Sequence, residues 1–205
     1  MGPSEYHEAL WRELPEGLEP PAFERRRAFL LKSLTPGRRA LDVGCGEGAF
    51  AAELAAAGAE VVGVDVAEEP LRRARARHPG LDLRLLAGET GWELPDSSFD
   101  LVWAGEVIEH VADTTGWLSE LRRVLRSGGS LVLSTPSVGW RELLAAALSG
   151  RAFAERFDPR ADHLRFYSAA TLRSLLEDFG FQEIEISRLA GSPSLLLCRA
   201  VRSRF

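Results

Sequence analysis

Short apolar runs alternate with segments of helical period from about residue 38 to the end of the chain. The runs are rich in β-branched residues and leucine, which is typical of buried strands. Between them, apolar residues recur every three or four positions, as they do on one face of a helix. We expect seven strands, over residues 40–43, 60–66, 81–87, 99–104, 130–136, 181–187 and 194–201.

Residues typical of helix ends support this alternation. Gly58 stands where the residue after a helix C-terminus belongs, and Ser168 is placed to cap the helix that follows it. A helix after Asp113 is expected to stop at Gly128 and Gly129. The last two strands are close enough in sequence to be antiparallel partners. The pattern predicts an α/β fold, a Rossmann-like seven-stranded mixed sheet whose last strand is antiparallel, with helices on both faces.

Two segments lie outside the alternation. Residues 1–37 have helical character, and residues 137–166 combine a helix with a loop that contains aromatic residues. We expect both to fold over the ends of the strands. The chain would then consist of an N-terminal helical lid segment, residues 1–37, and one ligand-binding domain, residues 38–205, that carries a substrate cap at 137–166.

The stretch LDVGCGEGAF, residues 41–50, forms a glycine-rich loop between an expected strand and an expected helix. Its glycines let backbone N–H groups approach a ligand closely at the positive end of the helix. Asp65 ends the next strand, at the spacing expected of a carboxylate that binds the ribose hydroxyls of a nucleotide. The arrangement predicts a site for an adenosine-containing ligand.

Two carboxylates near the loop bear on the identity of that ligand. Asp42 precedes the loop and Glu47 lies inside it. At ~5 Å and an effective dielectric constant near 20, each would repel a pyrophosphate by roughly 3 kcal/mol. A ligand with an ammonium and a sulfonium group would be attracted instead, so we expect S-adenosylmethionine as the cofactor. A nicotinamide-dependent oxidoreductase and a cofactor-binding module without catalysis remain alternatives.

Five stretches carry a family resemblance: LDVGCGEGAF, VVGVDV, AGETGWELPDSSFDLVWAGEVIEHV, LRSGGSLVLSTP and HLRFYSAATLRSLLEDFGF. Together they resemble the successive motifs of class I S-adenosylmethionine-dependent methyltransferases, and most closely the small-molecule branch that includes the ubiquinone-type O-methyltransferases. The resemblance covers about residues 38–188. It implies an enzyme that transfers a methyl group from S-adenosylmethionine to an oxygen, nitrogen or carbon nucleophile of a small molecule, with the cofactor at the carboxyl ends of strands one to four.

The resemblance also implies roles for individual residues around the cofactor. Asp42 would lie near its amino group, the loop glycines along its methionine part, and Asp65 on its ribose hydroxyls. Val66 would lie against the adenine, where the family also uses an aspartate that this chain replaces with Glu89. The cofactor-binding residues expected in this way are Asp42, Gly44, Cys45, Gly46, Asp65, Val66, Glu89, Thr90 and Gly105.

Methyl transfer from a sulfonium is an in-line displacement, so catalysis depends largely on alignment in a dry site. A base helps when the acceptor is a hydroxyl. His110 is chemically suited to that role near neutral pH, and His163 could line the acceptor pocket. The alternatives are a histidine that fixes a turn through its backbone contacts and a partly exposed loop histidine. Glu106 would share a helical face with His110, and because it has no matching acidic partner we expect no metal site.

Charge and cysteine content narrow the partners and the location. The formal net charge of −5 offers no general attraction to a polyanion, so we expect a small-molecule methyl acceptor and no nucleic acid. Cys45 and Cys198 form no disulfide framework, and no apolar run is long enough to span a bilayer. We therefore expect a soluble, cytoplasmic protein without a membrane partner. The pattern is not diagnostic of an oligomeric state.

Overall fold

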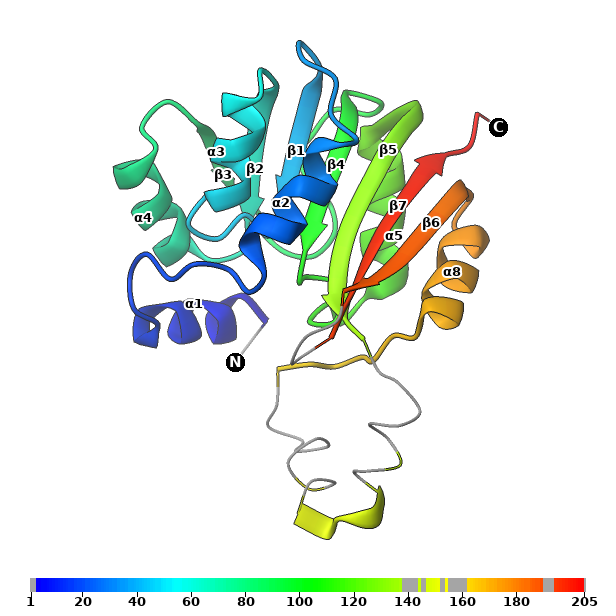
Figure 1. Ribbon diagram of the computed structural model, residues 1–205. Helices are drawn as coiled ribbons and strands as arrows, with labels where there is room; N and C mark the ends of the chain where they lie inside the picture. The colour runs from blue at the N-terminus through cyan, green and yellow to red at the C-terminus, as the bar shows by residue number, and fades with distance from the viewer. Residues whose placement is uncertain are drawn as a thin grey trace.

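A single sheet forms the centre of the computed structural model, and its strand order is β3-β2-β1-β4-β5-β7-β6 (Figure 1). Neighbouring strands are parallel, except that β7 runs antiparallel to β5 and β6. The predicted seven-stranded mixed sheet is confirmed. The strands are β1 (Arg39–Val43), β2 (Glu60–Asp65), β3 (Asp82–Leu85), β4 (Phe99–Gly105), β5 (Leu125–Pro136), β6 (Phe181–Leu189) and β7 (Leu195–Arg202). The structure describes residues 3–137, 144, 147–151, 154, 162–189 and 194–204.

Helices cover both faces of the sheet, because side chains of successive strand residues point to opposite faces. Leu41 and Val43 pack into the core on the side of α5 and α8, whereas Ala40 packs with α2 and α3. Among the described residues, every helix is too short or too polar to cross a lipid bilayer. The helices are α1 (Pro3–Glu13), α2 (Phe23–Leu31), α3 (Ala49–Ala56), α4 (Glu68–Arg77), α5 (Thr114–Val124) and α8 (Ala169–Asp178).

Two of the expected helix boundaries are confirmed and one is wrong. Ser168 caps α8, and Gly58 follows α3 with a φ of +90°. Helix α5, however, ends at Val124, before the two glycines predicted to stop it. Leu125 leaves the helical conformation and pairs with Phe99 of β4, which gives β5 an early start. Gly128 then adopts a φ of +78° where the register between β4 and β5 shifts, so this glycine forms part of a β-bulge.

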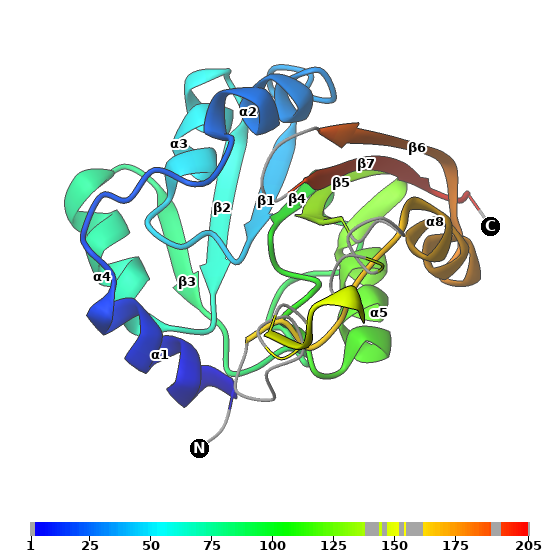
Figure 2. The same ribbon diagram turned by 60° about the horizontal axis from the view of Figure 1, so that its bottom comes forward.

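Helix α1 lies at the carboxyl ends of the strands, next to α4 (Figure 2). The expected cap over residues 137–166 falls largely outside the described residues. Its last part, residues 162–166, runs along the turn that follows β4, where the Leu164 N–H donates to the Glu109 carbonyl at 2.8 Å. The two ends of the expected cap region therefore lie at the same end of the sheet as α1.

Candidate active site

A cavity of about 340 Å³ lies at the carboxyl ends of β1, β2 and β4. This is the point where the chain order in the sheet reverses, which is where open α/β sheets bind ligands. The volume is in the range of small-molecule sites. None of the described residues that line the cavity is a lysine or arginine. Its lining carboxylates are Asp65, Glu89, Glu106 and Asp162.

The glycine loop contributes its backbone to the wall of this cavity. Gly44 has a φ of +68°, and a Cβ atom there would lie 2.5 Å from the side chain of Val107, so the position requires glycine. Three N–H groups at the start of the loop are already engaged within the protein. Those of Gly44 and Cys45 donate to the Val64 carbonyl at 2.8 and 3.0 Å, and that of Gly46 donates to Asp65 at 2.9 Å. These amides hold the loop against β2 and do not form a nest for an anion.

Asp65 lies at the end of β2, with its carboxylate at the cavity wall. Its two oxygens accept the N–H groups of Gly46 and Ala67 at 2.9 and 3.0 Å, which fixes the orientation of the carboxylate. Burial raises its pKa above the usual range, although these two hydrogen bonds oppose the shift. Each carboxylate oxygen retains capacity to accept a further hydrogen bond from a ligand hydroxyl.

Asp42 lies behind the cavity wall and does not line it. Its side chain is buried, and its Oδ2 atom accepts no hydrogen bond from any described residue. Burial raises the pKa of Asp42 to about 7, and the charge of Asp65 contributes to the shift. The carboxyl is therefore divided between its charged and neutral forms near neutral pH.

Glu47 does not support the charge argument made from the sequence. It lies outside the cavity lining, and its carboxylate forms ion pairs with Arg73 at 3.2 Å and Arg77 at 2.8 Å. The interpretation of Glu47 as a group that repels phosphate is wrong, because its charge is balanced within the protein. The carboxylates that do face the cavity come from four other segments.

Helix α1 covers the cavity with one of its faces. Ser4, His7 and Trp11 line the cavity and follow one another at intervals of three or four residues, as side chains on one helical face do. Arg73 of α4 holds this helix in place, since it donates to the carbonyls of Trp11 and Leu14 at 2.7 and 2.9 Å. Arg73 is only 7% exposed. Arg73 therefore packs against α1 and does not belong to the solvated face of the arginine-rich helix α4.

Arg26 is a charged residue near the site that the sequence interpretation missed. It is buried, and its guanidinium stacks on Phe50 at 4.7 Å and on Trp103 at 5.5 Å. Burial lowers its pKa, whereas the nearby charges of Glu106, Glu109 and Asp42 act in the opposite direction. The segment FERRRAFLL contained a signal, because Phe23, Arg26 and Leu30 share the face that packs on the sheet.

The segment after β4 is a turn, so the expected helical pairing of Glu106 with His110 is wrong. Glu106 has a φ of +59°, and its N–H still pairs with Ser134 of β5 at 2.9 Å. This continuation of the sheet, followed by a left-handed residue, prevents a helix from starting at Glu106. The Ser134 hydroxyl also donates to the Glu106 carboxylate at 2.7 Å and holds it at the cavity wall.

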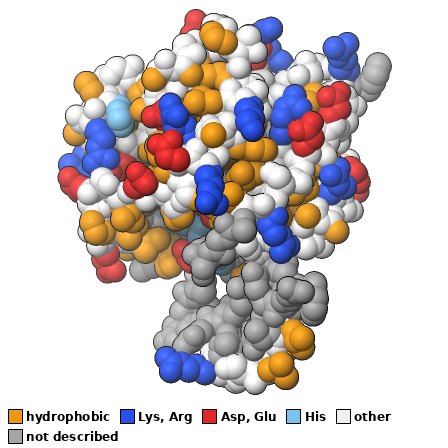
Figure 3. All heavy atoms as spheres, viewed as in Figure 1, with side chains coloured by type: hydrophobic (Ala, Val, Ile, Leu, Met, Phe, Trp, Pro, Cys, Tyr) orange, Lys and Arg blue, Asp and Glu red, His pale blue; other side chains and the backbone are white. Residues whose placement is uncertain are grey.

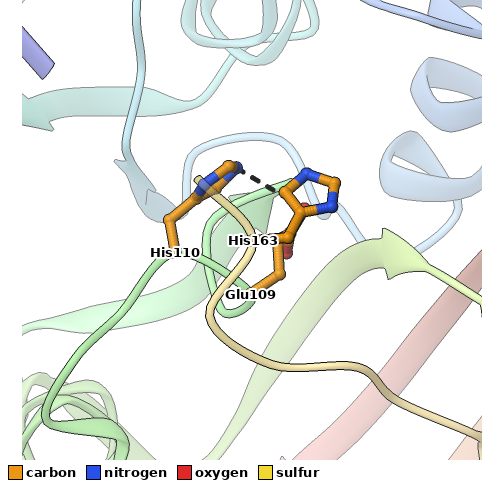
Figure 4. A group of neighbouring side chains, drawn as sticks. All are labelled: Glu109, His110 and His163. Atoms are coloured by element: carbon orange, nitrogen blue, oxygen red, sulfur yellow. Dashed lines mark ion pairs between the residues drawn. The ribbon is translucent and has the colours of Figure 1, made fainter. Parts of the chain in front are cut away.

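His110 lines the cavity at the end of this turn. Its Nδ1 lies 3.0 Å from the carbonyl oxygen of Asp162, which can only accept, so Nδ1 carries the hydrogen and Nε2 the lone pair. Burial lowers the pKa of His110, which favours the neutral ring near neutral pH. His163 does not line the cavity, but its ring centroid lies 4.9 Å from that of His110. Figure 4 shows these two rings beside Glu109.

The structure separates the nine expected cofactor-binding residues into two groups. Cys45 packs in a small core cluster behind the loop, and Gly105 leaves no room for a side chain beside Arg26. Glu89 lines the cavity while its carboxylate accepts the N–H groups of residues 112 and 113 at 2.9 and 2.8 Å. The residues at the cavity are Gly44, Asp65, Val66 and Glu89. The residues outside its lining are Asp42, Cys45, Gly46, Thr90 and Gly105.

Residues 10–186 match the model of a family described as a methyltransferase domain. A ubiquinone biosynthesis O-methyltransferase of a Ruegeria species is 36% identical over 165 residues, which cover 78% of this chain and 66% of that protein. A probable S-adenosylmethionine-dependent methyltransferase of Mycolicibacterium smegmatis is 36% identical over 152 residues, or 71% of this chain and 52% of that protein. The chain thus spans between about half and two thirds of the length of these curated relatives.

A solved methyltransferase structure has a similar fold. The crystal structure of an S-adenosylmethionine dependent methyltransferase from Mesorhizobium loti superposes with a TM-score of 0.69 and 25% sequence identity. The match covers 88% of this chain and 97% of that chain. The two chains therefore share their fold over almost the whole of the Mesorhizobium protein.

Proposed function

This chain belongs to the family of S-adenosylmethionine-dependent methyltransferases, and we propose that it transfers the cofactor's methyl group to an oxygen, nitrogen or carbon nucleophile of a small molecule in the cavity covered by α1. The observation that carries this proposal is the charge of the cavity. Carboxylates line it, and none of its described lining residues is a lysine or arginine. Such a lining favours a cation over a phosphate.

The cavity fits each part of S-adenosylmethionine. Asp65 is held at the wall by two backbone N–H groups and retains acceptor capacity for the ribose hydroxyls. Val66 and Trp92 offer apolar surface for the adenine next to it. Glu106 supplies negative charge on the other side, where the ammonium and sulfonium groups would lie. When bound, the cofactor supplies a methyl group made electrophilic by the positive sulfur.

A dinucleotide fits less well. Pyrophosphate recognition by a glycine loop depends on free backbone N–H groups in the loop and at the start of the helix. Here the N–H groups of Gly44, Cys45 and Gly46 are bound to acceptors in or at the end of β2. The loop therefore shapes the cavity by its lack of side chains.

The chain's own residues would contribute alignment and the exclusion of water. Trp11 and Trp117 line the cavity from opposite elements, α1 and α5, and enclose the ligand with apolar surface. In a dry site, a methyl carbon held between sulfur and nucleophile reacts with little reorganisation. His110 presents an Nε2 lone pair and could accept a proton from a hydroxyl acceptor. Its other role is structural, because it links the turn after β4 to Asp162.

The proposal extends to the lid, the acceptor and the location. Residues 1–37 act as a lid through α1, and the segment at 137–166 contributes to the acceptor side. The acceptor is a small molecule and not a nucleic acid; on the face drawn in Figure 3, charges of both signs are interspersed. A reducing, cytoplasmic location agrees with Cys45 and Cys198, which are both free and buried.

Calorimetric titration with S-adenosylmethionine tests the assignment of the cofactor site. The unaltered chain should bind one cofactor per chain. Asp65→Asn should weaken binding about 10- to 100-fold, because hydrogen bonds to a charged acceptor contribute roughly 1.5–3 kcal/mol. Asp82→Asn is the matched control, since Asp82 is exposed on the neighbouring strand β3 and should leave the affinity unchanged. Equal affinities for the two variants would refute the role given to Asp65.

A further inference from the structure

Three side chains of metal-ligand type converge next to the cavity. Glu109 and His110 lie in the turn after β4, and His163 lies in the segment that runs along this turn. Their ligand atoms all lie within 4.8 Å of one another, and Figure 4 shows the two rings and the carboxylate grouped together. The N–H of Leu164 and the side chain of Arg165 bind carbonyls of the turn, so the two segments are held in this arrangement.

Glu109 presents an oxygen without a partner to this group. Its side chain is only 1% exposed, and its Oε2 atom accepts a hydrogen bond from Thr135 at 2.9 Å. Its Oε1 atom is buried and accepts no hydrogen bond from any described residue. A buried carboxylate oxygen is costly unless it binds a hydrogen or a cation. This oxygen lies 3.9 Å from Nε2 of His110.

The orientation of His110 suits a metal ligand. Its Nδ1–H donates to the carbonyl oxygen of Asp162 at 3.0 Å, which leaves the lone pair on Nε2. Metal-binding histidines are usually fixed in this way, by a hydrogen bond from the second ring nitrogen to a carbonyl or carboxylate. The Nε2 lone pair is on the side of Glu109 Oε1 and of the His163 ring.

We propose that Glu109, His110 and His163 bind one divalent transition-metal ion, and we take Zn²⁺ as the example for its geometry. Two imidazoles and one carboxylate are a ligand set for zinc or iron, whereas magnesium and calcium prefer oxygen ligands alone. Ligands about 2.0–2.1 Å from a tetrahedral zinc lie about 3.4 Å from one another. The ligand atoms here lie within 4.8 Å of one another, and His110 Nε2 lies 3.9 Å from Glu109 Oε1, so binding of the ion would have to draw them closer together. Three protein ligands leave at least one coordination position open, as catalytic sites require.

The open coordination position would affect which methyl acceptor the site favours, and this step rests on the proposed methyl transfer. His110 also lines the cavity, so the bound ion would be next to the acceptor space. With its Nε2 lone pair on the ion, His110 would no longer act as the base, and a hydroxyl bound to the ion would lose its proton to water more readily. The oxygen then forms a bond to the methyl carbon, the carbon–sulfur bond breaks, and its electron pair stays on sulfur. The site therefore favours an oxygen acceptor over the nitrogen and carbon alternatives.

Metal titration of the chain tests this proposal without any knowledge of the acceptor. The protein should be prepared without a polyhistidine tag and treated with EDTA to remove bound metal. It is then titrated with ZnCl₂, followed by calorimetry, and with CoCl₂, followed by visible absorption. We expect one ion per chain. Glu109→Gln and His163→Ala should each weaken binding by at least about 100-fold, the upper end of what even second-shell changes cost. His78→Ala is the matched control, because His78 lies at the end of α4, outside the group.

The outcomes separate this proposal from the proposed function. His163 is partly exposed, so its removal leaves the core intact and keeps the test valid if Glu109→Gln fails to fold. No binding of Zn²⁺ or Co²⁺, or binding that both variants retain, would overturn the metal site. S-adenosylmethionine titrated in the presence of EDTA should still bind. If it binds and the metals do not, only the metal site is wrong, and if it does not bind, the proposed function fails as well.

Discussion

The buried carboxyl of Asp42 should make the stability of the protein depend on pH in a defined direction. Burial, with a contribution from the charge of Asp65, raises its pKa from 3.8 to about 7. The folded state therefore binds this proton more tightly than the unfolded state does. The stabilising contribution of the proton is complete below the unfolded pKa and is lost as the pH rises through about 7.

The size of this effect follows from the shift. A difference of about 3 pKa units corresponds to about 4 kcal/mol of the free energy of unfolding, at 1.36 kcal/mol per unit. About 3 kcal/mol of this would be lost between pH 4.5 and pH 8. Asp42→Asn removes the titration. The new amide also places a donor where Oδ2 has no partner, which costs about 1–3 kcal/mol at every pH.

Urea unfolding of both proteins, followed by circular dichroism at several pH values, measures the difference between them. The free energy of unfolding of Asp42→Asn, relative to the unaltered chain, should rise by about 3 kcal/mol from pH 4.5 to pH 8. Asp82→Asn is the control and should differ from the unaltered chain by nearly the same amount at pH 4.5 and pH 8, because Arg84 lowers the pKa of Asp82 in the folded state and this carboxyl therefore titrates below that range. A difference between Asp42→Asn and the unaltered chain that stays constant across this range would exclude a raised pKa for Asp42 in the folded protein.

Two further substitutions test contacts that position the site. Arg26→Met removes a buried charge that is close to several carboxylates. The free energy of unfolding, measured by urea titration, should therefore fall by about 3–5 kcal/mol. Arg25→Met, at an exposed position, is the control and should change this free energy by less than about 0.5 kcal/mol. Arg73→Met frees the carbonyls at the end of α1, and amide hydrogen exchange in α1 should accelerate about 10- to 100-fold. Unchanged exchange, with Arg72→Met as the control, would contradict the role of Arg73.

The strands could be predicted from the sequence because they are defined by local patterns. A buried parallel strand is a continuous apolar run, and such runs mark β1, β2 and β4 in any context. The cap at Ser168 and the glycine at 58 are equally local, since each satisfies the backbone of its own helix end. Helix α5 was placed correctly at its start, where the Asp113 side chain accepts the Gly116 N–H at 2.9 Å.

The errors concern side chains whose partners are distant in sequence. Glu47 lies in the loop as expected, but its charge is balanced by Arg73 and Arg77 of α4. His110 meets His163 only because a segment from beyond β5 folds back along the turn after β4. Local sequence patterns do not indicate pairs of side chains that are distant along the chain. Carboxylates line the cavity, but neither Asp42 nor Glu47, the two residues from which the sequence predicted an acidic site, is among them.

The carboxylate-lined cavity at the strand ends should bind a cationic adenosine derivative in preference to a phosphate-bearing one. Calorimetric titration of one protein preparation with S-adenosylmethionine and, separately, with NAD measures this preference. We predict that S-adenosylmethionine binds at one molecule per chain and that NAD produces no binding heat. Saturable binding of NAD, with none of S-adenosylmethionine, would show that the cavity does not select a cationic ligand.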